Sequence, residues 1–215
     1  MTLNTLISGH VRFKDSFDRH RRYWAKLVGE GQHPHVLWIG CSDSRVIPEQ
    51  ITAARPGDLF VMRNLANVVP PCGTTADATS AVLEYAILEL GVEHIIVCGH
   101  TFCVGVGAIL DRGSLNTASY MARWLSWIRP ALSQVETSGL PEEDRYLETI
   151  KANVLLQCGN VESYPDVSHA LRAGRLSVHG WLFDLESGDL IVYDDATNKW
   201  QDVRSPSDEQ ATIPE

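Results

Sequence analysis

Three short runs of continuously apolar residues constrain the fold of this chain more than any other feature of its sequence. They are His35–Gly40, Leu59–Met62 and His94–Cys98. Apolar runs of this length, without alternating polar residues, are typical of strands that are buried on both faces, as in parallel sheets. Before the third run, Thr75–Leu90 carries apolar residues at helical spacing and is followed by a glycine. Strands that alternate with helices predict an α/β fold with a mostly parallel central sheet flanked by helices.

The remaining segments fit one domain with an arm and a tail, as expected for 215 residues. Residues 1–30 carry apolar and aromatic side chains at mixed helical spacing, which predicts an arm of one or two amphipathic helices. Residues 31–200 form the predicted α/β domain, and residues 201–215 form a polar C-terminal tail. Within the domain we also expect helices over Asn116–Ile128 and Glu142–Leu156, and strands over Leu176–Asp184 and Leu190–Tyr193 that meet at a hairpin turn.

Charge and cysteine usage exclude several classes of protein. The chain has 18 basic and 27 acidic residues, a net charge of −9, which disfavours nucleic acid or an anionic membrane as the main partner. No stretch approaches the roughly 18 apolar residues of a membrane span, and the N-terminus lacks the pattern of a secretory signal. Five cysteines, an odd number in a chain of this length, indicate thiols in a reducing compartment and not a disulfide framework. We therefore expect a cytoplasmic protein.

The residues with the most informative chemistry follow two of the predicted strands. Cys41-Ser-Asp43-Ser-Arg45 comes after the first run, and His100-Thr-Phe-Cys103 comes after the third. The carboxyl ends of parallel strands meet at one edge of a sheet, where ligand sites form. Residues two apart in extended chain project to the same side, so Cys41, Asp43 and Arg45 can face one cavity. His100 and Cys103 are three apart, which predicts that they share one face of a helix's first turn.

Two sulfurs, one imidazole and a possible carboxylate are the ligand chemistry of zinc. The alternative is that Cys41 and Cys103 are buried packing thiols and that His100 is a hydrogen-bonded core histidine. The other three cysteines lack a histidine or acidic neighbour at ligand spacing, so for them packing is the preferred interpretation.

Asp43 admits two functional interpretations. As a fourth zinc ligand it would close the site, whereas paired with Arg45 it would leave the fourth position to water, as in a catalytic zinc site. If Asp43 can bind either the metal or Arg45, it would act as a switch that closes or opens the fourth position. A plain salt bridge with Arg45 that tightens the loop is the other interpretation. Two thiolates cancel the charge of zinc, so we expect activity to favour alkaline pH.

At these residues the chain resembles the β-class carbonic anhydrases. The similar segments are Cys41-Ser-Asp-Ser-Arg45, Pro56-Gly-Asp-Leu-Phe-Val-Met-Arg-Asn64, Leu83-Glu-Tyr85, His94-Ile-Ile-Val-Cys-Gly-His100 and Val178-His-Gly-Trp181. The resemblance implies one zinc per chain on Cys41, His100 and Cys103, with Asp43 as a ligand only in a closed form. It also implies reversible hydration of CO2 to bicarbonate through a zinc-bound hydroxide, with Asp43 and Arg45 as the catalytic dyad. N-terminal helices that wrap a partner would make a homodimer or a dimer of dimers.

The resemblance further implies a CO2 pocket and a second anion pocket. The residues that match the CO2 pocket are Gln32, Phe60, Leu65 and Tyr85, which the resemblance places at a subunit interface. Without it, the last three would be core residues. Some members of the family close the site through a non-catalytic bicarbonate pocket, and the residues that match it are Trp38, Gly40 and Arg63. The position of the tyrosine in that pocket corresponds to Phe183, which lacks the hydroxyl, so we expect bicarbonate regulation to be weakened or absent.

A departure beside the metal keeps two other functions open. The family usually has glycine after the last cysteine and a small or polar residue before it, where this chain has Val104 and Phe102. The larger apolar side chains of Phe102 and Val104 favour one alternative, a hydrolase of the same fold that acts on the apolar molecules CS2 or COS. The other alternative is a catalytically silent zinc protein that senses bicarbonate or scaffolds a partner. An intact pair of Asp43 and Arg45 argues against the silent protein, because a purely structural zinc site needs no switch.

Overall fold

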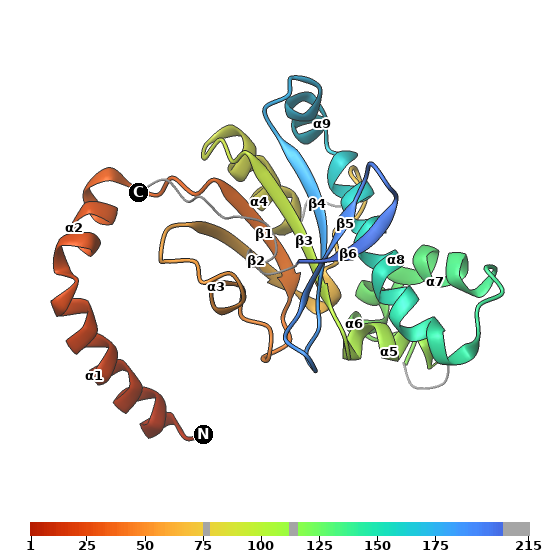
Figure 1. Ribbon diagram of the computed structural model, residues 1–215, viewed down its shortest axis with the longest axis horizontal. Coiled ribbons are helices and arrows are strands. Elements are labelled where there is room, and N and C mark those ends of the chain that lie inside the picture. Colours follow the sequence, from red (N-terminus) through yellow and green to blue (C-terminus); the bar gives the residue numbers. More distant parts are fainter. Residues whose placement is uncertain (75–77, 112–115, 204–215) are drawn as a thin grey trace. The chain divides into compact units, whose positions relative to one another are not determined.

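The computed structural model describes residues 1–74, 78–111 and 116–203 of the chain (Figure 1). The chain divides into two compact units, residues 1–33 and residues 34–215. Within the described ranges, no helix is both long and apolar enough to cross a membrane.

The N-terminal unit consists of two helices, as predicted. Helix α1 (Leu3–Arg19) begins with a capping box between Thr2 and Thr5, and α2 (Arg21–Glu30) follows a break at His20. The ring of Phe17 on α1 stacks on Trp24 of α2 with their centroids 5.0 Å apart. Neither of these two helices contains a buried residue. Their apolar side chains therefore pack on one another but do not form a core.

The second unit is built on a six-stranded sheet with the order β2-β1-β3-β4-β5-β6. The strands are β1 (Val36–Cys41), β2 (Leu59–Asn64), β3 (His94–His100), β4 (Ser177–Phe183), β5 (Leu190–Asp194) and β6 (Lys199–Asp202). The first four strands pair in parallel, whereas β5 and β6 are antiparallel to their neighbours. This arrangement confirms the mostly parallel sheet and the hairpin between the last two predicted strands.

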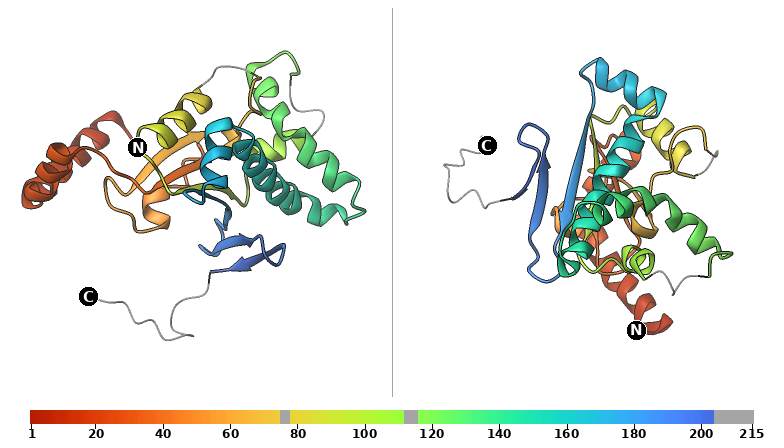
Figure 2. Two further views of the ribbon diagram at one scale, coloured as in Figure 1. Left: turned by 90° about the horizontal axis from the view of Figure 1, so that it is seen from above. Right: turned by 90° about the vertical axis from the view of Figure 1, so that its right-hand side faces the viewer.

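One face of the sheet is covered by α4 (Ala78–Leu88), α8 (Glu142–Glu162) and α9 (Pro165–Arg172), which gather on the same side in both views of Figure 2. Alternate residues of β1 and β3, among them Leu37 and Ile95, enter a core with apolar residues of these helices. Gly99 lets α8 approach closely, since a Cβ at that position would lie 2.7 Å from Cγ2 of Val154. On the opposite face, Trp38, Ile96 and Cys98 form a smaller buried cluster.

Short helices close the carboxyl edge of the parallel strands. They are α3 (Pro48–Ile51), η1 (Leu65–Asn67), α5 (Val104–Leu110), α6 (Tyr120–Leu125), η2 (Ser126–Ile128) and α7 (Arg129–Glu136). The helices α5 to α7 and η1 share a second core with Cys41 and Cys103, so the two thiols lie at the junction of the sheet and these helices.

The structure contains elements that the sequence analysis did not predict. They are α3, η1, α7, α9 and β6, and β6 takes Gln201 and Asp202 from the segment expected to be a polar tail. β6 has only four residues, of which one is apolar, so its pairing with β5 and not its own pattern makes it a strand. The start of the helix predicted from Thr75, and the rest of the predicted tail, lie outside the described residues.

Candidate metal centre

Three potential ligands converge at the carboxyl edge of the sheet. Cys41 ends β1, His100 ends β3, and Cys103 precedes α5 as its N-cap. All three residues are buried, and their ligand atoms lie within 4.8 Å of one another. The chain runs from β1 to β2 on one side and then returns to β3 on the other, so this edge is the point where the strand order reverses. Ligand sites of open α/β sheets form at such a point.

The link between His100 and Cys103 differs from the prediction. They do not share the first turn of a helix, because His100 is still in β3 and α5 begins only at Val104. Phe102 between them has a φ of 58°, in the left-handed region that bulky residues rarely adopt. This turn reverses the chain between the strand and the helix, and it directs both side chains to one point. Strained backbone of this kind is concentrated at functional sites.

The orientation of His100 leaves one ring nitrogen available. Its Nδ1 lies 2.8 Å from the carbonyl oxygen of Thr101, so Nδ1 carries the proton and donates it. Nε2 then presents a lone pair. It is buried and has no hydrogen-bond partner among the described residues. A buried, partnerless acceptor between two thiols is what a metal ligand requires, and the carbonyl bonded to Nδ1 fixes its tautomer.

The two sulfurs share a proton. A hydrogen bond from the Cys103 thiol lowers the pKa of Cys41, and the same hydrogen bond together with burial raises the pKa of Cys103. Both sulfurs can therefore be thiolates together only if a cation lies between them. The amide of Ala66 points at Cys41 Sγ from 3.4 Å, which also favours the thiolate. Two thiolates and one imidazole fit zinc.

Asp43 is held by Arg45 beside this group. The guanidinium donates from Nε to Asp43 Oδ1 at 2.9 Å and from Nη2 to Oδ2 at 2.7 Å, and the Arg45 amide donates to Oδ1 at 3.0 Å. These bonds hold the pKa of Asp43 far below its usual value. Asp43 Oδ2 is 3.9 Å from His100 Nε2. The carboxylate thus pairs with Arg45 while it lies close to the ligand nitrogen of His100.

Several groups that support the site could not be found from sequence patterns. Arg45 Nη2 also donates to the carbonyl oxygen of Phe102 at 3.2 Å, which ties the acid–base pair to the turn before Cys103. The hydroxyl of Tyr146 on α8 donates to the carbonyl oxygen of Cys103 at 2.8 Å. Tyr146 lies 43 residues from Cys103 in sequence. No local pattern could have linked the two, and Ala66 likewise carries no side-chain signal.

The residues expected to line a CO2 pocket are found in two places. Phe60 on β2 and Tyr85 on α4 have ring centroids 5.8 Å apart, and Tyr85 is 43% exposed. Leu65 follows β2 and is 46% exposed, while its carbonyl oxygen accepts a bond from Trp124 Nε1. The interpretation of Leu65 and Tyr85 as core residues is therefore wrong for this chain. Gln32 belongs to the N-terminal unit.

The residues expected to form a bicarbonate pocket share one face of the sheet. Gly40 is next to Trp38 on this face, and a Cβ there would lie 2.5 Å from Trp38 Nε1. That nitrogen is buried and has no hydrogen-bond partner in the part of the chain described. Arg63 pairs with Gly40 across β1 and β2 and donates to the carbonyl oxygens of Cys41 and Asp43 at 2.9 and 2.6 Å. Phe183 packs against the cluster that contains Trp38.

The other cysteines of the described chain do not belong to a second cluster of potential metal ligands. Among residues 1–74, 78–111 and 116–203, Cys41, His100 and Cys103 are the one set of three or more potential ligands so close together. Cys98 is buried in apolar surroundings that raise its pKa, as predicted for a packing thiol, whereas Cys72 is exposed.

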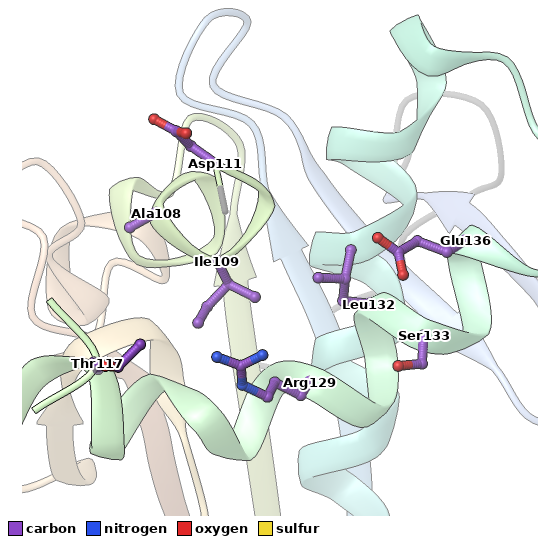
Figure 3. A pocket seen from close by; sticks show the side chains of 9 residues that line it. Ala108, Ile109, Asp111, Thr117, Arg129, Leu132, Ser133 and Glu136 are labelled. Carbon is purple, nitrogen blue, oxygen red and sulfur yellow. The ribbon is translucent and has the colours of Figure 1, made fainter. Parts of the chain in front are cut away.

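A pocket of about 360 Å³ lies between α5 and α7, with Arg129 pointing toward Ile109 (Figure 3). It contains none of the predicted site residues.

Comparison with known proteins agrees with this geometry. The sequence profile described as "Carbonic anhydrase" matches residues 36–190, more than half of the chain. The chain belongs to the carbonic anhydrase family. A carbonic anhydrase of Pseudomonas aeruginosa is 37% identical over 92% of this chain and 90% of its own length. One from a Synechocystis strain is 36% identical over 99% of this chain and 81% of its own length.

Solved structures assign the chain to the β class. The β-carbonic anhydrase CcaA superposes with a TM-score of 0.86 and 34% identity, over 94% of this chain and 92% of that one. One of two tetrameric β-carbonic anhydrases from Sordaria macrospora superposes with a TM-score of 0.74 and 30% identity, over 94% and 96% of the two chains. The resemblance seen in the sequence is thereby confirmed at the level of family and fold.

Proposed function

We propose that this carbonic anhydrase hydrates CO2 reversibly to bicarbonate and a proton at one zinc ion held by Cys41, His100 and Cys103. The observation that carries the proposal is the buried Nε2 of His100, which faces two sulfurs without a hydrogen-bond partner of its own in the described chain. When bound there, zinc would supply the Lewis acidity that makes water nucleophilic, at a more alkaline pH than at a site with neutral ligands.

We assign to Asp43 and Arg45 the control of the fourth position at the metal. Three hydrogen bonds from Arg45 hold the carboxylate of Asp43, which leaves that position to solvent. The strongly lowered pKa of Asp43 means that it remains ionised at neutral pH. It therefore accepts and orients a hydrogen bond and does not retain a proton. Loss of the bonds from Arg45 would release the carboxylate toward His100 Nε2, 3.9 Å away, and would close the site.

Apolar surface near the site supports a small, uncharged substrate. Phe60, Leu65 and Tyr85 supply apolar side chains, and we assign to them the apolar lining of the CO2 pocket. Phe102 and Val104 flank Cys103 and are 50% and 73% exposed. Because this surface would also accept the apolar molecules COS and CS2, the test has to compare all three substrates.

The exposed apolar residues of the N-terminal helices support assembly with a second copy. We propose a homodimer or a dimer of dimers, in line with the tetrameric relatives from Sordaria macrospora. The cytoplasm is the proposed location, because a reducing compartment keeps the ligand thiols available.

The experiment that tests the proposal measures turnover of CO2, COS and CS2 side by side on zinc-loaded protein. The expected result is rapid CO2 hydration with slow or no hydrolysis of the sulfur compounds. Val104→Gly is the matched variant, since it removes bulk beside Cys103 without changing a proposed ligand. Preferential turnover of CS2 or COS would overturn the proposal in favour of the hydrolase. No turnover of any substrate by protein with one zinc per chain would favour the silent zinc protein.

A further inference from the structure

Two histidines meet at the other end of the sheet, far from the Cys-His-Cys group. His94 begins β3, and His179 lies on the neighbouring strand β4. His94 Nδ1 and His179 Nε2 are 3.3 Å apart, and the hydroxyl oxygen of Ser177 lies 2.7 Å from the first and 2.8 Å from the second. Both ring nitrogens therefore point to one place.

The spacing of these three atoms is that of ligands around a single metal ion. With metal–nitrogen distances of 2.0–2.1 Å, two neighbouring ligands are about 2.8–3.4 Å apart, the shorter separations for an octahedral ion and the longer for a tetrahedral one. The separation of 3.3 Å between the two nitrogens falls within that range. The strand pairing that produces it is regular, since His94 pairs with Ser177 and Ile96 pairs with His179. The strand register thus places the two histidines close together before any ion binds.

We propose that His94 and His179 form a second binding site for a divalent transition-metal ion such as Zn²⁺, in which the two ring nitrogens chelate the ion. Imidazole nitrogens suit zinc, copper and nickel, and the partly exposed position leaves room for water to complete the coordination. Ser177 either rotates away or remains as a weak third ligand.

The charges around the pair are compatible with a bound cation. Burial and the neighbouring ring of His94 lower the pKa of His179, while the carboxylate of Asp195 raises it. His179 therefore favours the neutral form that coordinates metal. His35, which directly precedes β1, pairs with Glu93 through Nδ1 and Oε1 at 3.3 Å, so its ring is engaged elsewhere.

This site would be independent of the catalytic one. His94 and His100 are the first and last residues of β3, so at about 3.3 Å per residue the two sites are roughly 20 Å apart. An ion chelated by β3 and β4 would link the two strands and stabilise the folded chain by mass action. It would not contact any residue proposed to act on CO2.

The test is equilibrium dialysis of zinc-loaded protein against increasing Zn²⁺, with bound metal counted by mass spectrometry. We expect the wild type to approach two ions per chain, and His94→Ala and His179→Ala to stop at one. His35→Ala is the matched control, because this histidine lies at the same end of the sheet but outside the pair; it should bind the second ion normally. Excess Zn²⁺ should also raise the unfolding midpoint of the wild type but not that of His179→Ala.

Either of two results would overturn the proposal. One is a wild-type chain that stops at one ion, a result that does not depend on whether the variants fold. The other is equal uptake of a second ion by the wild type and by both histidine variants, which would locate that ion elsewhere. Ser177→Ala keeps both imidazoles and should retain the second ion, so loss of binding in this variant alone would assign the site to the hydroxyl.

Discussion

Replacement of Gly99 by alanine tests whether the contact between α8 and the strand that carries His100 is as close as the structure indicates. A Cβ at this position would lie 2.7 Å from Val154 Cγ2 and 3.4 Å from Ile150 Cγ2. Carbon atoms in favourable contact are about 3.5–4.0 Å apart, so the first contact is a clash. Val154 is fully buried and cannot move into solvent. Either α8 or β3 must therefore shift.

The expected cost follows from the packing alone. Gly99 does not have a positive φ, so alanine brings no backbone strain there. Overpacking of a filled core costs about 1–3 kcal/mol of unfolding free energy. Val154→Ala alone should cost about 2 kcal/mol, because it removes two buried methyl groups and leaves a cavity. In the double variant the new Cβ occupies space that the valine has left, so the two costs should not add, with a coupling of about 1 kcal/mol or more.

The assay is urea unfolding of zinc-loaded protein at one fixed concentration, together with zinc affinity measured by competition with a chelator. Because His100 follows Gly99 directly, Gly99→Ala should also weaken zinc binding, and the second substitution should restore part of it. The matched control is Gly159→Ala on the exposed side of α8, where a Cβ would meet nothing within 4 Å. It should stabilise the protein by about 0.5–1 kcal/mol through helix propensity.

Two outcomes would refute this reasoning. If Gly99→Ala were as stable as the wild type, the close approach of α8 to β3 would be wrong. If the costs of Gly99→Ala and Val154→Ala simply added, the two positions would not share the same space.

Three further predictions concern the site and the assembly. Because Arg45 holds the pKa of Asp43 below its usual value, the stability that this pair contributes is complete above about pH 4 and is lost only in stronger acid. The difference in thermal midpoint between the wild type and Asp43→Asn should thus stay constant from pH 9 to 5, and a difference that disappears between pH 7 and 5 would contradict this. Bicarbonate should inhibit the wild type weakly and Phe183→Tyr more strongly; steep, cooperative inhibition of the wild type would argue against the role given to Phe183. Deletion of residues 1–33 should lower the oligomeric state in sedimentation, and an unchanged oligomer would exclude the N-terminal helices as the link.

Much of the fold follows from local sequence patterns. The apolar runs that become β1, β2 and β3 have no amphipathic alternation because both faces of these strands are packed, so their pattern identifies them without tertiary information. In contrast, β6 is a polar edge strand that exists only through its pairing with β5. Its sequence could not distinguish it from a polar tail.

The site was predictable in its chemistry but not in its backbone. The positions of Cys41 and His100 after two adjacent parallel strands were sufficient to expect that they meet. The left-handed conformations of Phe102 and Ala66, with φ of 58° and 59°, were not predictable, because residues of these types rarely adopt them and no sequence signal marks them. Contacts such as that from Tyr146 to Cys103 depend on how α8 packs, which is decided by the whole core.

The most direct test of the proposed function measures stopped-flow CO2 hydration at mildly alkaline pH and zinc content on the same samples of wild type and Cys41→Ala. The account predicts rapid hydration with about one zinc per chain at the Cys-His-Cys group, and loss of both in the variant. Undiminished hydration by Cys41→Ala, or a wild type that holds zinc at this group without hydrating CO2, would contradict it.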